Sequence, residues 1–318
     1  MNDIVFYNLD FEKVYILPAS SRETGYVSMT YRIDFADSGT FQLSFWDAEL
    51  EALIRQSTEG LLLEYGAFQG FLTDYQFKDT EKKAFGMHLN GLLYKEVLPA
   101  VAQTTGTLEE LAYALIENNY TWLLTAAEVG GFPQATLETD TYKNGNDVIN
   151  ELVQRYNCGY TISFDSAAKT LTFKLLKSEM NPLMLSENNL NAYGFQEDYD
   201  IKDAAFGGWY EEEQEDADPI WKYITTAAKT GIRRQNIVLS AKQADEALEE
   251  LKQKTVQRQM TASTRNLTCG VDYNIGDRVR VQNGNETVVK MITAVEFSNE
   301  NNQINEKPIM NDWNEVSE

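Results

Sequence analysis

A segment in the middle of the chain, residues 142–176, shows the clearest pattern of hydrophobic and polar positions. Val148, Leu152 and Tyr156 recur at a spacing of four, which places them on one apolar face of a helix. Asn144 stands just before this face, where its side chain can accept a hydrogen bond from a free backbone N–H group. The pattern therefore predicts an amphipathic helix that begins after Asn144.

A β-hairpin is predicted directly after this helix. Cys158-Gly159 ends the helix, and hydrophobic residues then alternate with polar ones over 160–164 and over 171–175. Residues 165–169 between the two runs are polar and form the predicted turn. Nothing in the segment resembles a catalytic motif, so we interpret it as a scaffold.

The first part of the chain, up to about residue 95, has the alternating pattern of short β-strands. Asp37-Ser38-Gly39 is a turn signal between two such strands and predicts a hairpin. Several short strands joined by tight turns are typical of a small barrel or sandwich. The predicted strands cover 5–7, 14–16, 25–35, 40–46, 61–65, 70–77 and 84–94, and a short helix covers 48–54.

Two further helices are predicted from capping-box patterns, in which Ser or Thr is followed three residues later by Glu or Gln. Thr107 and Glu110 begin the first of these helices. Ser240 and Gln243 begin the second, which is predicted over 240–257. Hydrophobic residues follow each box at helical spacing, so each helix is expected to pack one face against a core.

The rest of the chain returns to the β pattern. The tail from Ser298 is rich in Asn and Glu and is expected to fray. The predicted strands cover 193–195, 203–210, 221–227, 231–239, 260–267, 278–282 and 286–297.

These patterns together predict an α+β protein, mainly β, with three consecutive domains. The first is a β-barrel domain over 1–100. The second is an α+β helix-hairpin domain over 101–190. The third is a second β-rich domain over 191–318 that contains the helix at 240–257.

Composition and charge exclude some classes of function. The chain has 318 residues, of which 43% are hydrophobic, and is long enough for two or three domains with their own cores. Its 27 Lys and Arg against 49 Asp and Glu give a net charge of −22, which argues against specific nucleic-acid binding and against anionic membranes. No apolar run is long enough for a transmembrane helix, and the N-terminus lacks the pattern of a signal peptide. No membrane anchor is therefore predicted.

Candidate catalytic groups are few. His88 is the only histidine and lies in an alternating segment, so we interpret it as a structural strand residue. Cys158 and Cys269 are interpreted as two reduced thiols, with a disulfide between them as the alternative. One His and two distant Cys are too few for a zinc site, and no phosphate-binding loop is present. The sequence therefore predicts no catalytic, cofactor-binding or metal-binding residues, and no cofactor.

An acidic segment, Glu211–Asp218, lies between two predicted strands. A divalent-cation site is one interpretation, but the segment lacks the spacing of a calcium loop, so a solvated loop is the simpler one. Gly207-Gly208, shortly before it, indicates a bulge or close packing. The 17 Tyr, 15 Phe and 5 Trp are enough to line a sugar cleft, yet many fall on alternating strand positions, which favours packing in a core.

Five stretches carry a resemblance to a known family, in this order along the chain. They are DSGTFQL (37–43), YKNGNDVINELVQRYNCGYTISFD (142–165), GIRRQNIVLS (231–240), VDYNIGDRVRVQ (271–282) and ITAVEFSNENN (292–302). With this order of motifs, the sequence resembles the baseplate hub proteins of long-tailed phages and of phage-tail-like particles, which include contractile injection systems. The resemblance covers most of the chain.

The resemblance implies a fold of two tail-tube-like β-barrel domains with a helix-plus-hairpin insertion. It also implies a non-enzymatic virion structural protein, a homotrimer that joins the six-fold tail tube to a three-fold spike or tip. The implied partners are tail-tube and distal tail proteins on one side and a spike, tip or fibre-bearing protein on the other. The implied location is the baseplate of a virion or phage-tail-like particle, with synthesis in the host bacterial cytoplasm.

Two other functions stay open. Larger relatives carry hydrolase or receptor-binding parts in a long C-terminal extension, whereas this chain ends at Glu318, soon after the second barrel pattern. One alternative is a tail-associated peptidoglycan or glycan hydrolase that uses carboxylates, because 49 acidic residues offer many pairs. The other alternative is a host-glycan binding module.

Overall fold

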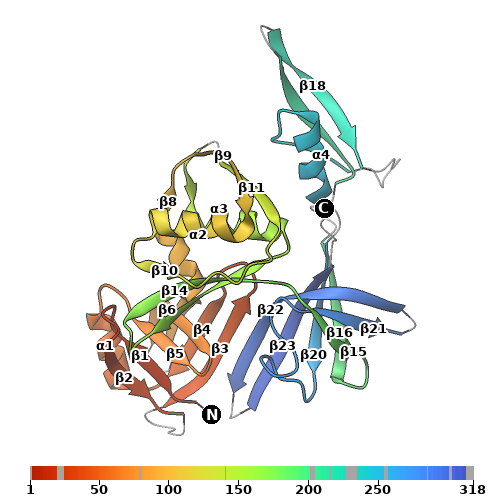
Figure 1. Ribbon diagram of the computed structural model, residues 1–318. Coiled ribbons are helices and arrows are strands. Elements are labelled where there is room, and N and C mark those ends of the chain that lie inside the picture. Colours follow the sequence, from red (N-terminus) through yellow and green to blue (C-terminus); the bar gives the residue numbers. More distant parts are fainter. Residues whose placement is uncertain are drawn as a thin grey trace. The chain divides into compact units, whose positions relative to one another are not determined.

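The chain divides into two compact units, which are described separately below (Figure 1). Unit 1 consists of Met1–Gly194 and Ala262–Glu318, and unit 2 consists of Phe195–Thr261. The predicted boundaries near residues 100 and 190 stay predictions. The computed structural model describes residues 2–19, 25–78, 81–139, 141–200, 205–214, 217–226, 235–253, 257–284, 286–300 and 303–312.

Strands from both ends of the chain form one 13-stranded sheet. The N-terminal strands are β1 (Ile4–Tyr7), β2 (Lys13–Leu17), β3 (Tyr26–Asp34), β4 (Thr40–Phe45), β5 (Leu62–Tyr65), β6 (Phe68–Lys78) and β7 (Glu81–His88). The later strands are β15 (Met180–Leu185), β16 (Leu190–Asp200), β20 (Gln257–Thr264), β21 (Arg278–Asn283), β22 (Glu286–Glu300) and β23 (Gln303–Asp312). The order is β16-β20-β23-β22-β3-β4-β7-β6-β5-β1-β2, and β21 pairs with both β22 and β15.

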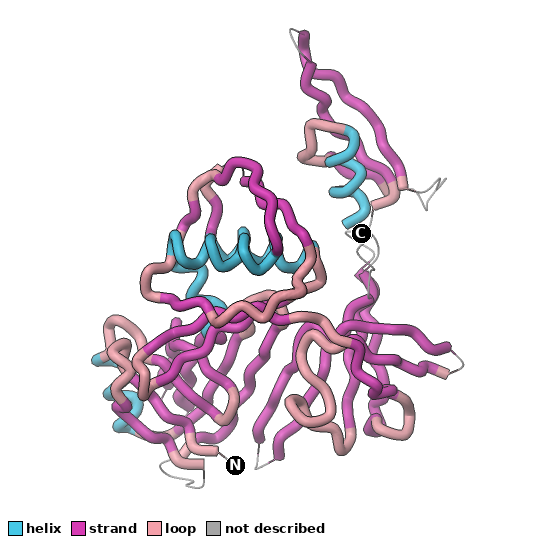
Figure 2. The backbone as a smooth tube through the Cα atoms, viewed as in Figure 1, coloured by secondary structure: helices cyan, strands magenta, loops and turns pink. Residues whose placement is uncertain are grey.

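The two predicted β regions meet at the antiparallel pair of β3 and β22. This pair runs from Asp34 opposite Ala294 to Ser28 opposite Glu300. Strands predominate throughout, as Figure 2 shows, so the predicted fold class, α+β and mainly β, is confirmed. Among the described residues no sheet closes on itself, and the two β regions share one open sheet.

The N-terminal strands enclose a core of their own, which α1 (Ala48–Gln56) completes. Leu50 and Ile54 of α1 are buried in it with residues of β1, β3, β4 and β5. The Asp47 side chain caps this helix by accepting a hydrogen bond from the Leu50 N–H group at 2.7 Å. The predicted helix at 48–54 and the predicted hairpin of β3 and β4 are both confirmed.

A second core lies in the helix-hairpin region of unit 1. Its helices are α2 (Leu108–Asn119) and α3 (Gly145–Arg155), and Leu89–Lys95 is a 3₁₀ helix, η1. Its strands are β10 (Leu123–Thr125), β13 (Gly159–Asp165) and β14 (Thr170–Leu176) in the order β10-β14-β13, with the pairs β9 (Val101–Thr107)–β11 (Gln134–Thr139) and β8 (Val97–Leu98)–β12 (Lys143–Asn144) beside them.

The helix caps of this region confirm where the sequence predicted α2 and α3 to begin. The Asn144 side chain accepts a hydrogen bond from the Asn146 N–H group at 2.9 Å, and α3 follows it directly. Thr107 and Glu110 form the predicted capping box at the start of α2, because each side chain accepts from the backbone N–H group of the other. The helix and hairpin predicted over 142–176 are therefore present.

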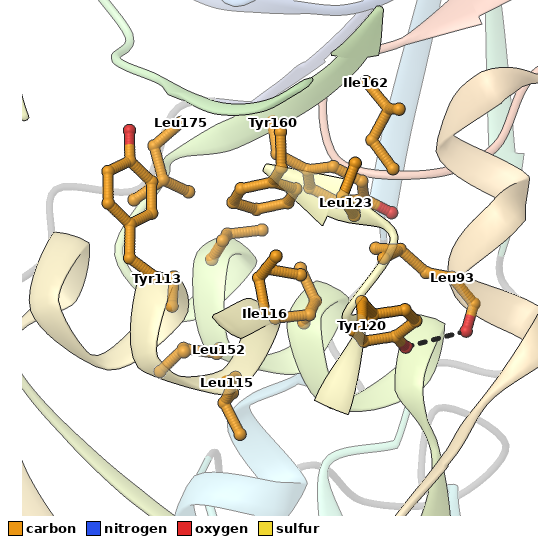
Figure 3. Close-up of a cluster of buried hydrophobic side chains, with 14 of the residues drawn as sticks. Leu93, Tyr113, Leu115, Ile116, Tyr120, Leu123, Leu152, Tyr160, Ile162 and Leu175 are labelled. Carbon is orange, nitrogen blue, oxygen red and sulfur yellow. Dashed lines mark hydrogen bonds between the residues drawn. The ribbon is translucent and has the colours of Figure 1, made fainter. Parts of the chain in front are cut away.

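Tyrosines connect the helices of this core to its strands (Figure 3). The Tyr120 hydroxyl donates to the Leu93 carbonyl at 2.9 Å. The fully buried Tyr160 stacks on Phe173, and its hydroxyl lies 2.8 Å from Asn150 Oδ1. The position of η1 and the hairpin against the helices is therefore fixed by hydrogen bonds as well as by packing.

The described part of unit 2 contains a three-stranded sheet and one helix of its own. The strands are β17 (Gly207–Gln214), β18 (Ala217–Thr225) and β19 (Asn236–Val238), in the order β18-β17-β19, and the helix is α4 (Ala244–Gln253). Tyr210 and Leu239 of the sheet are buried with Ala247 and Leu251 of α4. One face of the sheet is thus covered by the helix.

Two predictions about unit 2 are wrong. The helix begins at Ala244, not at Ser240, because the Ser240 backbone N–H and hydroxyl groups both donate to the Glu250 carboxylate instead of capping the first turn. Residues 254–256 lie outside the described part, and Gln257 already belongs to β20. The acidic segment is not a loop between the strands, since Glu211 and Glu212 lie within β17.

The predicted fraying of the tail is also wrong as far as Asp312. Strand β23 pairs with β22 over most of its length, and its Ile309 and Met310 are buried. These apolar residues stabilise a strand whose other positions are mostly polar. The prediction of a strand over 84–94 was too long, because β7 ends at His88 and η1 follows. The strand predicted around 193–195 is not isolated, because β16 pairs with β20.

We expect Leu152→Asp to unfold the helix-hairpin region. Leu152 is 3% exposed, so the substitution removes its packing and buries a charge, at a cost of more than about 4 kcal/mol. A thermal melt followed by circular dichroism measures the effect. Glu151→Ala on the exposed side of the same helix is the control, with an expected change below about 1 kcal/mol. An unchanged melt of Leu152→Asp would show that the side chain is not in the core.

We expect Asn90→Ala to lower the free energy of unfolding by about 3 kcal/mol, because three hydrogen bonds, two of them buried, lose their partner. The Asn90 side chain donates to the Asp37 and Tyr160 carbonyls at 3.1 and 3.2 Å and accepts from the Ile162 N–H group at 2.8 Å. Urea denaturation measures the loss, with the exposed Asn305→Ala as control. In hydrogen exchange, the Ile162 amide should lose protection first, and equal protection in both proteins would contradict the assignment.

Candidate functional site

A groove of about 1440 Å³ lies within unit 1. The N-terminal strands β3, β4, β6 and β7 line it, together with β22, β23 and the segment 264–268. Most of its side chains are hydroxyls, amides and a few aromatic rings, among them Thr30, Gln42, Phe85, Ser298 and Asn305. Such a lining suits hydrogen bonding to a polypeptide or other polar surface.

Two ion pairs lie in or beside the groove. Arg32 Nε donates to both oxygens of Asp34 at 2.8 and 2.9 Å, and Lys307 lies 3.9 Å from Glu296. Burial nevertheless raises the pKa of Asp34 above its ordinary value, although Arg32 works against this shift. We find in this arrangement a structural ion pair and no general acid–base pair.

Cys269 lies next to the groove but is a poor nucleophile. The Glu306 carboxylate accepts a hydrogen bond from the Cys269 N–H group at 2.7 Å and from the Tyr273 hydroxyl at 3.2 Å. Burial, and then the negative charge of Glu306, raise the pKa of the Cys269 thiol to about 12. The thiol stays protonated at neutral pH, and so does Cys158, whose pKa burial raises to about 11. The structure shows both cysteines as free thiols.

His88 is buried at the end of β7. Its Nδ1 accepts a hydrogen bond from the Asn90 N–H group at 3.3 Å, so the ring caps η1. The ring lies 5.6 Å from that of Phe68. Burial lowers the pKa of His88 to about 4, so the imidazole is neutral at physiological pH. This geometry agrees with a structural role for His88. The absence of a catalytic role for His88 stays a prediction.

The acidic segment does not gather into a cation site in the part that the structure describes. Glu212 forms an ion pair with Lys222 across the hairpin, and Glu211 with Lys242 at 2.9 Å. No group of three or more His, Cys, Asp or Glu among the described residues is arranged to hold a metal ion. These ion pairs offset the charge of Glu211 and Glu212 within the strand. The acidic segment alone does not show them, because both lysines lie outside it.

Gly207 and Gly208 mark close packing, as one of the two predicted interpretations has it. A Cβ on Gly208 would come within 2.5 Å of Leu239 Cδ1, and one on Gly207 within 2.1 Å of the Tyr223 hydroxyl. Among the helices that the structure describes, none is long and apolar enough to cross a membrane.

The groove is a feature that the sequence analysis missed, because its walls come from segments more than 200 residues apart.

Comparisons with known proteins agree on the fold. No family model matches the sequence, and no curated protein matches it. A tail protein from Neisseria meningitidis superimposes with a TM-score of 0.60 at 12% identity, covering 99% of this chain and 97% of that one. The 43 kDa tail protein of prophage MuSo2 from Shewanella oneidensis gives 0.58 at 14% identity and 97% coverage of both chains.

Prophage tail protein gp18 from Listeria monocytogenes is similar over nearly its whole length as well. The TM-score is 0.56 at 12% identity, and the match covers 98% of this chain and 95% of that chain. Identities this low establish the fold and nothing more. The chain therefore has the fold of these phage tail proteins from end to end, as the order of its sequence motifs predicts.

Proposed function

We propose that this chain is a structural hub protein of the baseplate of a phage or phage-tail-like particle. In this proposal, three copies form a ring at the distal end of the tail tube and join the six-fold tube to a three-fold spike or tip. The observation that carries the proposal is the likeness to three tail proteins over at least 97% of this chain. The likeness therefore includes both units of the chain and is not limited to one of them.

The architecture of unit 1 fits this role. Each chain carries two β regions, which are joined through β3 and β22 into one sheet. Three copies would therefore present six β regions, and this number matches a six-fold tube. Tail-tube and distal tail proteins would contact one side of such a ring, and a spike, tip or fibre-bearing protein the other.

The described residues also support a non-enzymatic role. The lone histidine is buried and neutral, both thiols are protonated at neutral pH, and Glu296 of the groove lies 3.9 Å from Lys307. A carboxylate-dependent hydrolase requires two carboxyl groups with different pKa values facing one substrate. No observation on the described residues favours that alternative over the hub.

Electron microscopy of the assembled particle tests the proposal. We expect density for this chain as a three-fold ring coaxial with the six-fold tube, because one ring of three chains has six β regions to offer. The chain co-expressed with its genomic neighbours should give the same ring. A position on the outside of the particle or on a fibre would overturn the hub assignment, and so would turnover of purified cell walls that a carboxylate substitution abolishes.

The state of His88 separates the hub from a His-dependent enzyme. The pKa of His88 falls from about 6.5 in the unfolded chain to about 4, so the neutral ring contributes stability above pH 6.5 that is lost as the pH falls towards 4. His88→Asn keeps an acceptor for the Asn90 N–H group and does not titrate. We expect the stability difference between wild type and variant to fall by on the order of 3 kcal/mol between pH 7 and pH 4.

Urea denaturation at the two pH values measures this change, and the carboxylates common to both proteins cancel in the difference. A difference that does not vary with pH would contradict a buried neutral ring. Ring assembly by a folded His88→Asn protein is expected, because the side chain lies in the core of unit 1.

A further inference from the structure

The face of the unit 2 sheet opposite α4 carries an exposed aromatic platform. Trp209 lies opposite Tyr223 on β18 and opposite Val238 on β19, and Trp221 lies opposite Glu211 in the same ladder. Residues that are paired in this way point to one face of a sheet. Trp209, Trp221, Tyr223 and Val238 are 43%, 54%, 39% and 70% exposed. The rings of Trp209 and Tyr223 lie 5.1 Å apart.

The fold of unit 2 does not require this platform. Its core is on the other face, where Tyr210, Leu239, Ala247 and Leu251 are buried. Two indoles and a phenol on the opposite face therefore add nothing to that core. Contiguous apolar surface of this kind, with polar residues around it, marks a binding site more often than chance exposure does.

Polar groups border the platform. The Tyr223 hydroxyl donates to Asn236 Oδ1 at 3.1 Å, and Asn236 and Thr225 both lie opposite Gly207 in the ladder. The lysines nearest the hairpin are neutralised, because Lys242 pairs with Glu211 and Lys222 with Glu212. The site therefore combines flat aromatic surface with hydrogen-bonding groups and little net positive charge.

The size and charge of the platform indicate the class of ligand. Three aromatic side chains exposed to about this extent offer roughly 300 Å² of flat surface together, enough for a short row of sugar rings. The chain carries a net charge of −22, which disfavours an anionic ligand. Sugar rings are small and neutral, present flat C–H faces to aromatic rings, and carry hydroxyls for a polar border.

We propose that this platform binds a neutral linear glycan, with sugar rings stacked on Trp209, Trp221 and Tyr223 and hydroxyl groups bonded along the border at Asn236. This function goes beyond the role of hub and does not depend on it. Unit 2 would bind the glycan whether or not three chains form a ring.

Isothermal titration calorimetry on the intact chain tests the proposal, with chitohexaose and cellohexaose as neutral probes and dextran sulfate as the anionic one. We expect saturable binding of a neutral probe and none of dextran sulfate. Trp221→Ala should weaken binding about tenfold, the value of one lost aromatic contact, while Trp221→Phe should retain most of it. Trp46→Ala is the matched control, because Trp46 is 42% exposed and belongs to unit 1, and its affinity should equal that of wild type.

Thermal melts establish that each variant is folded, and Trp209→Ala, which should weaken binding in the same way, keeps the test decisive if Trp221→Ala is not folded. Absence of saturable binding to both neutral probes would overturn the proposal. The proposal would also be overturned if Trp46→Ala weakened glycan binding as much as Trp221→Ala, because the effect would then not be specific to the unit 2 platform. A wild-type oligomer that Trp221→Phe or Trp221→Ala dissociates, without binding of either neutral probe, would assign the face to a protein partner instead.

Discussion

The free edge of β13 is the constraint on which the arrangement of unit 1 depends. This strand ends its own three-stranded sheet, so its outer N–H and C=O groups need partners once they are buried. Two side-chain amides supply them, one from η1 and one from β6 of the large sheet. Asn90 pairs with the Tyr160 carbonyl and the Ile162 N–H group, and Gln69 pairs with both backbone groups of Phe164 at 2.9 and 3.0 Å. An amide carries one donor side and one acceptor side, so it replaces a missing strand residue. The helix-hairpin region is thus attached to the large sheet at a single register.

A second polar contact holds the two ends of the chain together. Asn299 of β22 is 1% exposed, and its amide nitrogen donates to the hydroxyls of Tyr26 and Tyr65 at 3.1 and 2.5 Å. Close by, Tyr31 of β3 stacks on Phe297 of β22 with ring centroids 4.6 Å apart. Because a buried amide must keep its partners, these contacts exclude a slip of β22 along β3. The groove beside this pair therefore has walls of fixed register.

Local signals in the sequence were sufficient to predict most of the helices and strands. They were not sufficient to predict which of these elements lie side by side. The helix and hairpin of 142–176 were predictable because caps and periodicity act within a few residues, as at Asn144 and in the Thr107 box. The pairing of β3 with β22 joins residues more than 250 positions apart, and no local pattern encodes it. The tail from Ser298 and the acidic strand β17 were misjudged for one reason, since composition was weighed without the partner strand that neutralises or covers it. The groove and the aromatic platform arise from the same long-range pairings.

The net negative charge of the chain opposes the assembly of several copies. If three copies form a ring, they bring together three times −22, or −66 charges, within the dimensions of one particle. Screening limits this repulsion to about 8 Å at physiological ionic strength, so charges at an interface are felt and distant ones are not. A stable ring therefore requires interfaces poor in free carboxylates. Some carboxylates of the groove and of β17 are already paired with Lys of the same chain, as Glu296 is with Lys307 and Glu211 with Lys242. Such internal pairs add no net charge where they lie, so they would not oppose the approach of a second copy.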